Sequence, residues 1–131
     1  MRQLLSALFL AVLLCAPASA APAADAARRL VELTLKEEVA PADPRVAQAQ
    51  AQLNKAAKLA GEDAQAVAAA SIRAARFLFD ATKAPVTPLD VLDAVAARGQ
   101  GRPLADTVGA YVEARRNSSG KTHAEAMAAM K

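Results

Sequence analysis

Apolar residues along most of the chain recur every three to four positions, which is the spacing of one face of an α-helix. The clearest stripe, in residues 44–60, consists of Val46, Ala49, Leu53, Ala56 and Ala60. Residues 63–82 carry two such rows and few charges after the first turn. A helix that is apolar on most sides belongs in the middle of a bundle.

Start and stop signals separate these helices. Asp43 precedes Pro44, and Thr87 precedes Pro88, which is the pattern of an N-cap residue followed by proline at the first helical position. Gly61 is of the residue type that most often ends a helix. We therefore expect helices at residues 25–39, 44–60, 63–82, 88–98 and 104–116, and a short one after Thr122.

The first of these segments is ambiguous. Val31, Leu33 and Leu35 alternate with polar residues as in a strand. No other segment offers a partner strand, and a lone strand could not satisfy its backbone groups, so we interpret residues 25–39 as helix and residues 21–24 as a flexible leader. The fold class predicted is all-α: a small alanine-rich bundle of about five helices plus a short C-terminal helix in one domain, residues 25–131.

The N-terminal segment has the pattern of a cleaved signal peptide. A single charge, Arg2, precedes an apolar run at residues 4–14, and small residues follow it. The run is shorter than the roughly 20 residues of a spanning helix. We expect residues 1–20 to be removed after Ala20, together with Cys15, leaving no stable membrane anchor. The predicted location is periplasmic or secreted, in a bacterium.

The composition limits the core. Residues 21–131 contain 32 alanines but only 21 Leu, Ile, Val and Phe together. Alanine is the best helix former but buries little apolar area, so we expect regular helices around a shallow core. A homo-oligomer is one way to add buried area. The same residues carry 15 Lys and Arg against 13 Asp and Glu, a balance that selects no class of partner.

No set of residues indicates catalysis or metal binding. His123 is the sole histidine, and we expect it to be solvent-exposed in the first turn of the last helix. Asp90 and Asp93 are explained by capping and by the favourable charge near a helix N-terminus. We predict no catalytic, cofactor-binding or metal-ligating residue and no cofactor.

Two groups of residues are candidates for binding. The basic group consists of Arg98, Arg102, Arg115 and Arg116. Its default interpretation is a solvated face with cations near helix C-termini, and the alternative is a surface for an acidic protein partner or an anionic surface. Helix, short glycine-containing turn and helix would also fit a DNA-reading motif, but export and the small net charge argue against nucleic acid. Phe77, Phe79 and Tyr111 could line a ligand pocket, although such residues are more often plain core.

From these observations we expect a small exported, non-enzymatic protein that binds another protein. Two alternatives stay open. The first is a carrier of a small apolar ligand, with a cavity in the bundle. The second is an enzyme whose site of scattered Arg, Asp and Tyr leaves no local pattern in the sequence.

Overall fold

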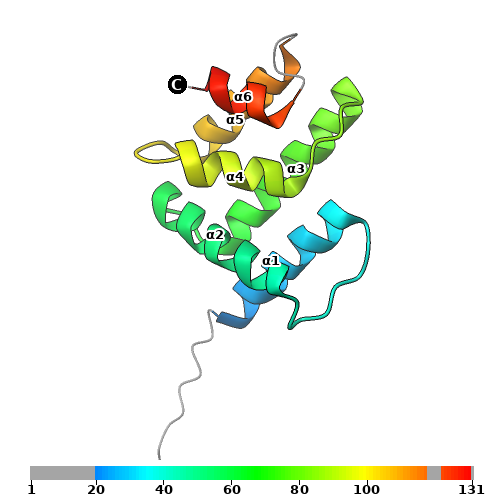
Figure 1. The fold of residues 1–131 in the computed structure, drawn as a ribbon. Coiled ribbons are helices and arrows are strands. Elements are labelled where there is room, and N and C mark those ends of the chain that lie inside the picture. Colours follow the sequence, from blue (N-terminus) through cyan, green and yellow to red (C-terminus); the bar gives the residue numbers. More distant parts are fainter. Residues whose placement is uncertain (1–19, 118–121, 131) are drawn as a thin grey trace, which may run out of the picture.

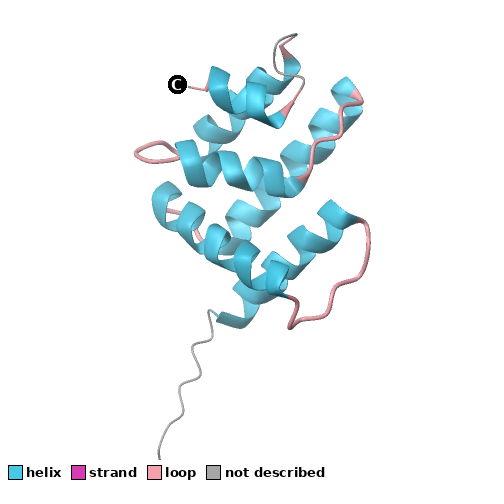
Figure 2. Ribbon diagram, in the orientation of Figure 1, coloured by secondary structure: helices cyan, strands magenta, loops and turns pink. Residues whose placement is uncertain are grey.

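The computed structural model describes residues 20–117 and 122–130, which form six helices. These are α1 (Ala20–Leu35), α2 (Pro44–Ala60), α3 (Ala64–Thr82), α4 (Pro88–Arg98), α5 (Leu104–Arg116) and α6 (His123–Ala129), drawn in Figure 1. Figure 2 shows only helices and loops over the same residues. The prediction of an all-helical bundle with five main helices and a short C-terminal one is confirmed.

Helix α3 is central, as its apolar surface predicted. It contacts α1, α2, α4 and α5. Helices α1 and α2 lie side by side at one end of the molecule, and α6 packs on α5 at the other end, with α4 between them (Figure 1). None of the helices in the described part of the chain has the length and apolar character needed to span a membrane.

The interior consists of two clusters of buried side chains. The first joins α1, α2, α3 and α4 and includes Leu30, Val31, Leu53, Val67, Leu92 and Val95. The second joins α3, α4, α5 and α6 and includes Leu78, Val91, Tyr111, Ala126 and Met130. Alanines fill much of the rest of both clusters. Two small cores, each spanned by α3 and α4, match the shallow packing that the composition predicts.

Three of the predicted helix starts, those of α2, α4 and α6, are confirmed in atomic detail. The Asp43 side chain accepts from the backbone N–H of Arg45 at 2.9 Å, and Thr87 and Asp90 form a reciprocal capping box. Hydrogen bonds from the Arg45 side chain and backbone lower the pKa of Asp43 to about 2. Thr122 accepts from the backbone of Glu125 at 3.2 Å and caps α6.

Both ends of α1 differ from the prediction. The helix begins at Ala20, so residues 21–24 are helical where a flexible leader was expected. Alanine favours helix, and Ala23 is buried. Residues 1–19 of the predicted signal peptide lie outside the described part of the chain.

At its other end α1 stops at Leu35, not at Val39, because the next residue turns into the left-handed conformation. Val39 still reaches the core from the loop. Arg28 Nε donates to the Val39 carbonyl at 2.8 Å, and the Val39 N–H donates to the Glu32 carboxylate at 3.2 Å. These two bonds replace the helical ones that Val39 would have made.

Candidate functional site

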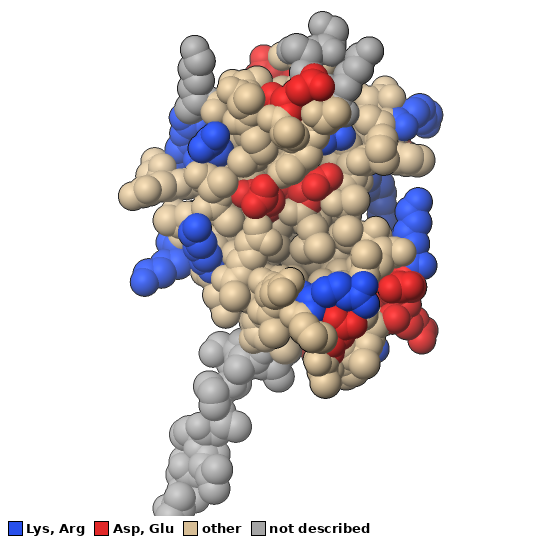
Figure 3. Space-filling model, viewed as in Figure 1, with Lys and Arg blue, Asp and Glu red and all other residues tan. Residues whose placement is uncertain are grey.

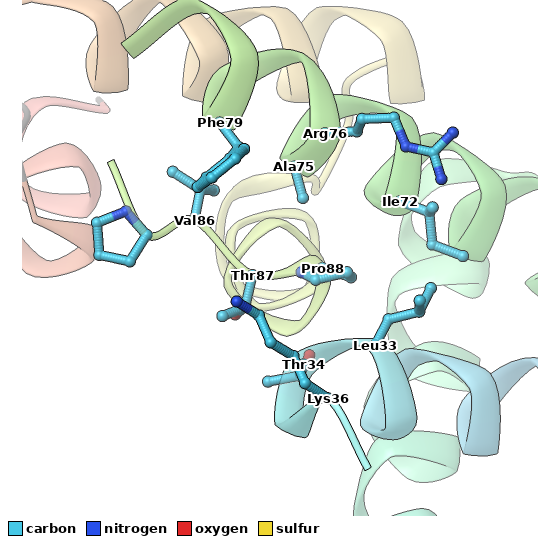
Figure 4. A pocket seen from close by; sticks show the side chains of 11 residues that line it. Leu33, Thr34, Lys36, Ile72, Ala75, Arg76, Phe79, Val86, Thr87 and Pro88 are labelled. Carbon is cyan, nitrogen blue, oxygen red and sulfur yellow. The ribbon is translucent and has the colours of Figure 1, made fainter. Parts of the chain in front are cut away.

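A groove lies where the end of α1, the second half of α3 and the loop before α4 meet (Figure 4). Its volume is about 310 Å³. The lining residues are Leu33, Thr34 and Lys36 from α1 and its end, Ile72, Ala75, Arg76 and Phe79 from α3, and Pro85, Val86, Thr87 and Pro88 from the loop and start of α4. We call this the α1–α3 groove.

The α1–α3 groove is apolar with a positive edge. Leu33 and Phe79, which are 38% and 49% exposed, approach it from α1 and α3. Its charged lining residues are Lys36 and Arg76, and no carboxylate lines it. The ammonium of Lys83 lies 5.9 Å from the centre of the Phe79 ring and adds a third cation nearby.

A second groove lies on the other side of α3, between α3 and α5. It measures about 500 Å³, and Phe77, 50% exposed, lines it with Leu104 and Val108. Glu62 and Arg73 supply charges of both signs. Because residues two apart on a helix point to nearly opposite sides, Phe77 and Phe79 belong to different grooves.

Near the C-terminal end, side chains from four helices form a polar relay. His123 Nε2 lies 2.7 Å from Asp93 Oδ2, and His123 Nδ1 lies 2.8 Å from the Tyr111 hydroxyl. At the two ends, Gln52 Nε2 donates to Asp93 Oδ1 at 3.0 Å and Arg115 Nη1 donates to the Tyr111 hydroxyl oxygen at 3.4 Å. The relay therefore ties α2, α4, α5 and α6 together.

When His123 is neutral, the hydrogen bonds of the relay have one consistent assignment of donors and acceptors. A carboxylate only accepts, so Nε2 donates to Asp93, and Nδ1 is free to accept from the Tyr111 hydroxyl. Burial raises the pKa of Tyr111 to about 12, against the opposing charge of Arg115. A hydroxyl nucleophile needs access to a substrate and an activating base, whereas Tyr111 is completely buried. The relay is therefore suited to holding α6 in place.

This geometry corrects the prediction for His123. Its side chain is 28% exposed and engaged at both ring nitrogens, not simply solvent-exposed. Asp93, assigned only to helix N-terminal charge, is its partner from α4. The part of the chain that the structure describes contains no group of three or more acidic, His or Cys side chains that could hold a metal.

The four predicted basic residues have different environments. Arg98 is exposed and donates to the Met127 carbonyl at 3.3 Å, and Arg102 is exposed on the loop before α5. Arg116 lies over the Phe77 ring at 5.9 Å. Arg115 is 5% exposed, so its inclusion in a partner-binding surface is wrong. Figure 3 shows acidic and basic side chains interspersed over the face in view.

The structure does not form the shared pocket expected of the three aromatic residues. Phe77 lines the α3–α5 groove, Phe79 lines the α1–α3 groove, and Tyr111 belongs to the core. The two phenylalanines are also not the plain core that the alternative interpretation assumed, because half of each is exposed.

Most of the α1–α3 groove was not predicted from the sequence. One signal was visible: Val31, Leu33 and Leu35 form an alternating run that does not fit one helical stripe. In the structure Val31 is buried and the two leucines are 38% exposed, Leu33 in the α1–α3 groove and Leu35 in a different pocket beside α2. Leu33, an apolar residue outside the buried stripe of its helix, thus indicated this surface.

Comparison with known protein families, curated proteins and solved structures found no match to the chain.

Proposed function

We propose that this chain is a non-enzymatic protein that binds another protein, and that the α1–α3 groove receives an apolar segment of the partner. The observation that carries the proposal is Phe79, which is half exposed at a groove lined mainly by apolar residues. Apolar grooves that accept part of a partner are a recurring mode of peptide recognition.

The distribution of aromatic residues supports this proposal. Phenylalanine is more often fully buried than tyrosine. In the described residues the order is reversed: Tyr111 is completely buried, while Phe77 and Phe79 are half exposed. A chain with so few large apolar side chains would gain stability by burying both rings. Their position at the surface is better explained by a partner that covers at least one of them.

Each exposed apolar side chain of the groove is expected to contribute modestly to the binding free energy. Full burial of a phenylalanine is worth about 1.5–3 kcal/mol, so covering the exposed half of Phe79 contributes about 1 kcal/mol. Leu33, also partly exposed, adds to it from the opposite wall. Loss of about 1.4 kcal/mol corresponds to a tenfold weaker complex, so one truncation in the groove has a measurable effect.

The proposed setting is the periplasm or exterior of a bacterium. Its support is the charge, apolar run and small residues of residues 1–20, which together resemble an export signal. A partner would then be found among exported or envelope proteins.

Photo-crosslinking from matched positions tests the binding proposal. A photoreactive phenylalanine analogue replaces Phe79 in one protein and Phe77 in the other, since these rings are equally exposed on the same helix. In a cell-envelope extract, position 79 should give a discrete protein adduct that position 77 does not. The purified partner should then bind Phe79→Ala about fivefold more weakly than wild type, with Phe77→Ala unchanged.

Three results would contradict the proposal. An adduct only from position 77 would move the binding surface to the α3–α5 groove. Equal weakening by both alanine variants would mean that neither groove is specific. An adduct made only with a second copy of the chain would indicate self-association in place of a separate partner.

A further inference from the structure

We infer that the segment received by the α1–α3 groove is acidic and amphipathic: apolar side chains enter between Leu33 and Phe79, and carboxylates beside them meet Lys36, Arg76 and the hydroxyl of Thr34. This inference rests on the proposed function and adds the chemistry of the partner. Three observations on the groove carry it.

The first observation is unneutralised positive charge. Lys36 and Arg76 line the groove from opposite sides (Figure 4), and their side chains make no ion pair or hydrogen bond with any residue that the structure describes. Arg76 does not pair with Asp80, although the two are four positions apart on α3. Of the acidic residues close to them in the sequence, Glu37 pairs with Arg45 at 3.7 Å and Asp90 belongs to the capping box, while Glu38 and Asp80 form no ion pair with the described residues and do not line the groove.

The second observation is a hydroxyl without a partner. The Oγ1 atom of Thr34 is buried and forms no hydrogen bond with the described residues, although Thr34 lines the groove. Other helical hydroxyls here bond back one turn: Ser71 donates to the Val67 carbonyl at 2.8 Å and Thr82 to the Leu78 carbonyl at 2.7 Å. A buried polar group without a partner costs about 1–3 kcal/mol. Because this atom has almost no accessible surface, a carboxylate from the partner would accept from Thr34 after the side chain rotates about its Cα–Cβ bond, and would then remove that cost.

The third observation concerns how the two helices beside the groove end. The residues after α1 and α3 are Lys36 and Lys83, in the left-handed conformation with φ of 59° and 58°. Glycine is the usual residue there, because a side chain in this conformation costs roughly 1–2 kcal/mol. Cations are favoured at helix C-termini, which offsets part of this cost. Both lysines nevertheless lie at one groove, Lys36 in its lining and Lys83 over Phe79.

Together these features select the occupant. Two lining cations and an unsatisfied hydroxyl match a segment with carboxylates, and a basic segment would be repelled. The volume of about 310 Å³ is at the small end of the range for ligand pockets. It therefore suits the apolar side chains of a short helical segment at i, i+3 and i+4, with acidic residues on both sides of that stripe.

Defined peptides test this inference. Three helical peptides share the same leucine stripe and differ only at the flanking positions, which are Glu, Gln or Lys; a straight-chain fatty acid is the fourth probe. Binding to the full protein is followed by backbone amide chemical shifts, which also locate the site. The Glu peptide should bind at least tenfold more tightly than the Lys peptide at low salt, and added salt should reduce this preference.

The chain offers a matched control. Arg76 and Arg73 lie on α3 and line different grooves. Arg76→Gln should reduce the preference for the Glu peptide over the Gln peptide, whereas Arg73→Gln should leave it unchanged. Thr34→Val removes the hydroxyl at nearly constant shape and should weaken the Glu peptide by about fivefold, in line with a hydrogen bond of about 1 kcal/mol.

Other results of the peptide experiment would refute the acidic partner, and one of them would also refute the protein-binding function. Equal affinity for the three peptides at the groove would refute the acidic partner and leave the proposed function intact. Tightest binding of the Lys peptide, or no shift in the groove with any peptide, would also refute the inference. If only the fatty acid bound there, with the same dependence on Arg76, both this inference and the protein-binding function would be replaced by a ligand carrier.

Discussion

The polar relay and the α1–α3 groove differ in the kind of side chain that each contains and in what those side chains contact. In the relay, polar side chains from four helices hydrogen-bond to one another around Tyr111 and His123, although the buried Nε of Arg115 has no partner among the described residues. In the groove, apolar side chains turn outward, and the Thr34 hydroxyl has no partner among the described residues. Residues that stabilise the fold and residues open to a partner are thus in separate places, which means that stability and binding should respond to different substitutions.

The largest expected effect separates the two regions by stability. Tyr111→Ala removes a completely buried ring and should lower the free energy of unfolding by about 3–5 kcal/mol. Phe79→Ala removes a ring that is half exposed and should cost under about 1 kcal/mol. Urea denaturation followed by far-ultraviolet circular dichroism measures both. Comparable losses for the two variants would show that the Phe79 ring is a core element and that the contrast is mistaken.

The helices were predictable where the signal is local. Asp43, Thr87 and Thr122 cap helices within three residues of themselves, so the sequence shows both the cap and what it bonds. The Leu35 end of α1 was not predicted, because after the turn at Lys36 the Val39 carbonyl accepts from Arg28 and the Val39 N–H donates to Glu32, and neither bond is visible as a local sequence pattern.

The candidate site was far less predictable. Asp93 and His123 are 30 residues apart, and only the packing of α6 brings them within hydrogen-bond distance. The walls of the α1–α3 groove come from three separate stretches of the chain, and nothing local to Lys36 or Arg76 indicates that they share a surface. Only Leu33, which lies outside the buried stripe of α1, indicated part of it.

The next prediction is a loss of folding stability at alkaline pH that originates in the relay, at Tyr111. The pKa of Tyr111 is about 12 in the folded protein and about 10 in an unfolded chain. Below pH 10 the hydroxyl is neutral in both states and its contribution to stability is complete. Between pH 10 and 12 only the unfolded chain ionises, so stability should fall with rising pH, by on the order of 2 kcal/mol.

Two measurements check this effect. Tyr111 is the only tyrosine in the chain, so the near-ultraviolet absorbance of tyrosinate reports its ionisation without ambiguity. Stability measured between pH 9 and 12 should fall less steeply in Tyr111→Phe, which also corrects for the loss of charge on lysines. A tyrosinate midpoint in the folded protein equal to that in urea would contradict the burial argument.

The smallest effect is also the sharpest test of the comparison, because it asks whether neighbours in each region act together. Tyr111→Phe and His123→Ala each remove the same hydroxyl–imidazole bond, which is 2.8 Å long. Once one partner is gone, removing the other costs less, so the double variant should be about 1 kcal/mol more stable than the sum of the single losses predicts.

Leu33 and Phe79 line opposite walls of the groove, and in the free protein the effects of Leu33→Ala and Phe79→Ala on stability should add within about 0.5 kcal/mol. With the groove occupied by its partner the second pair should become coupled, since one bound segment then contacts both walls. Coupling in the free protein would mean that the groove is already closed on itself, and a partner would have nothing left to cover.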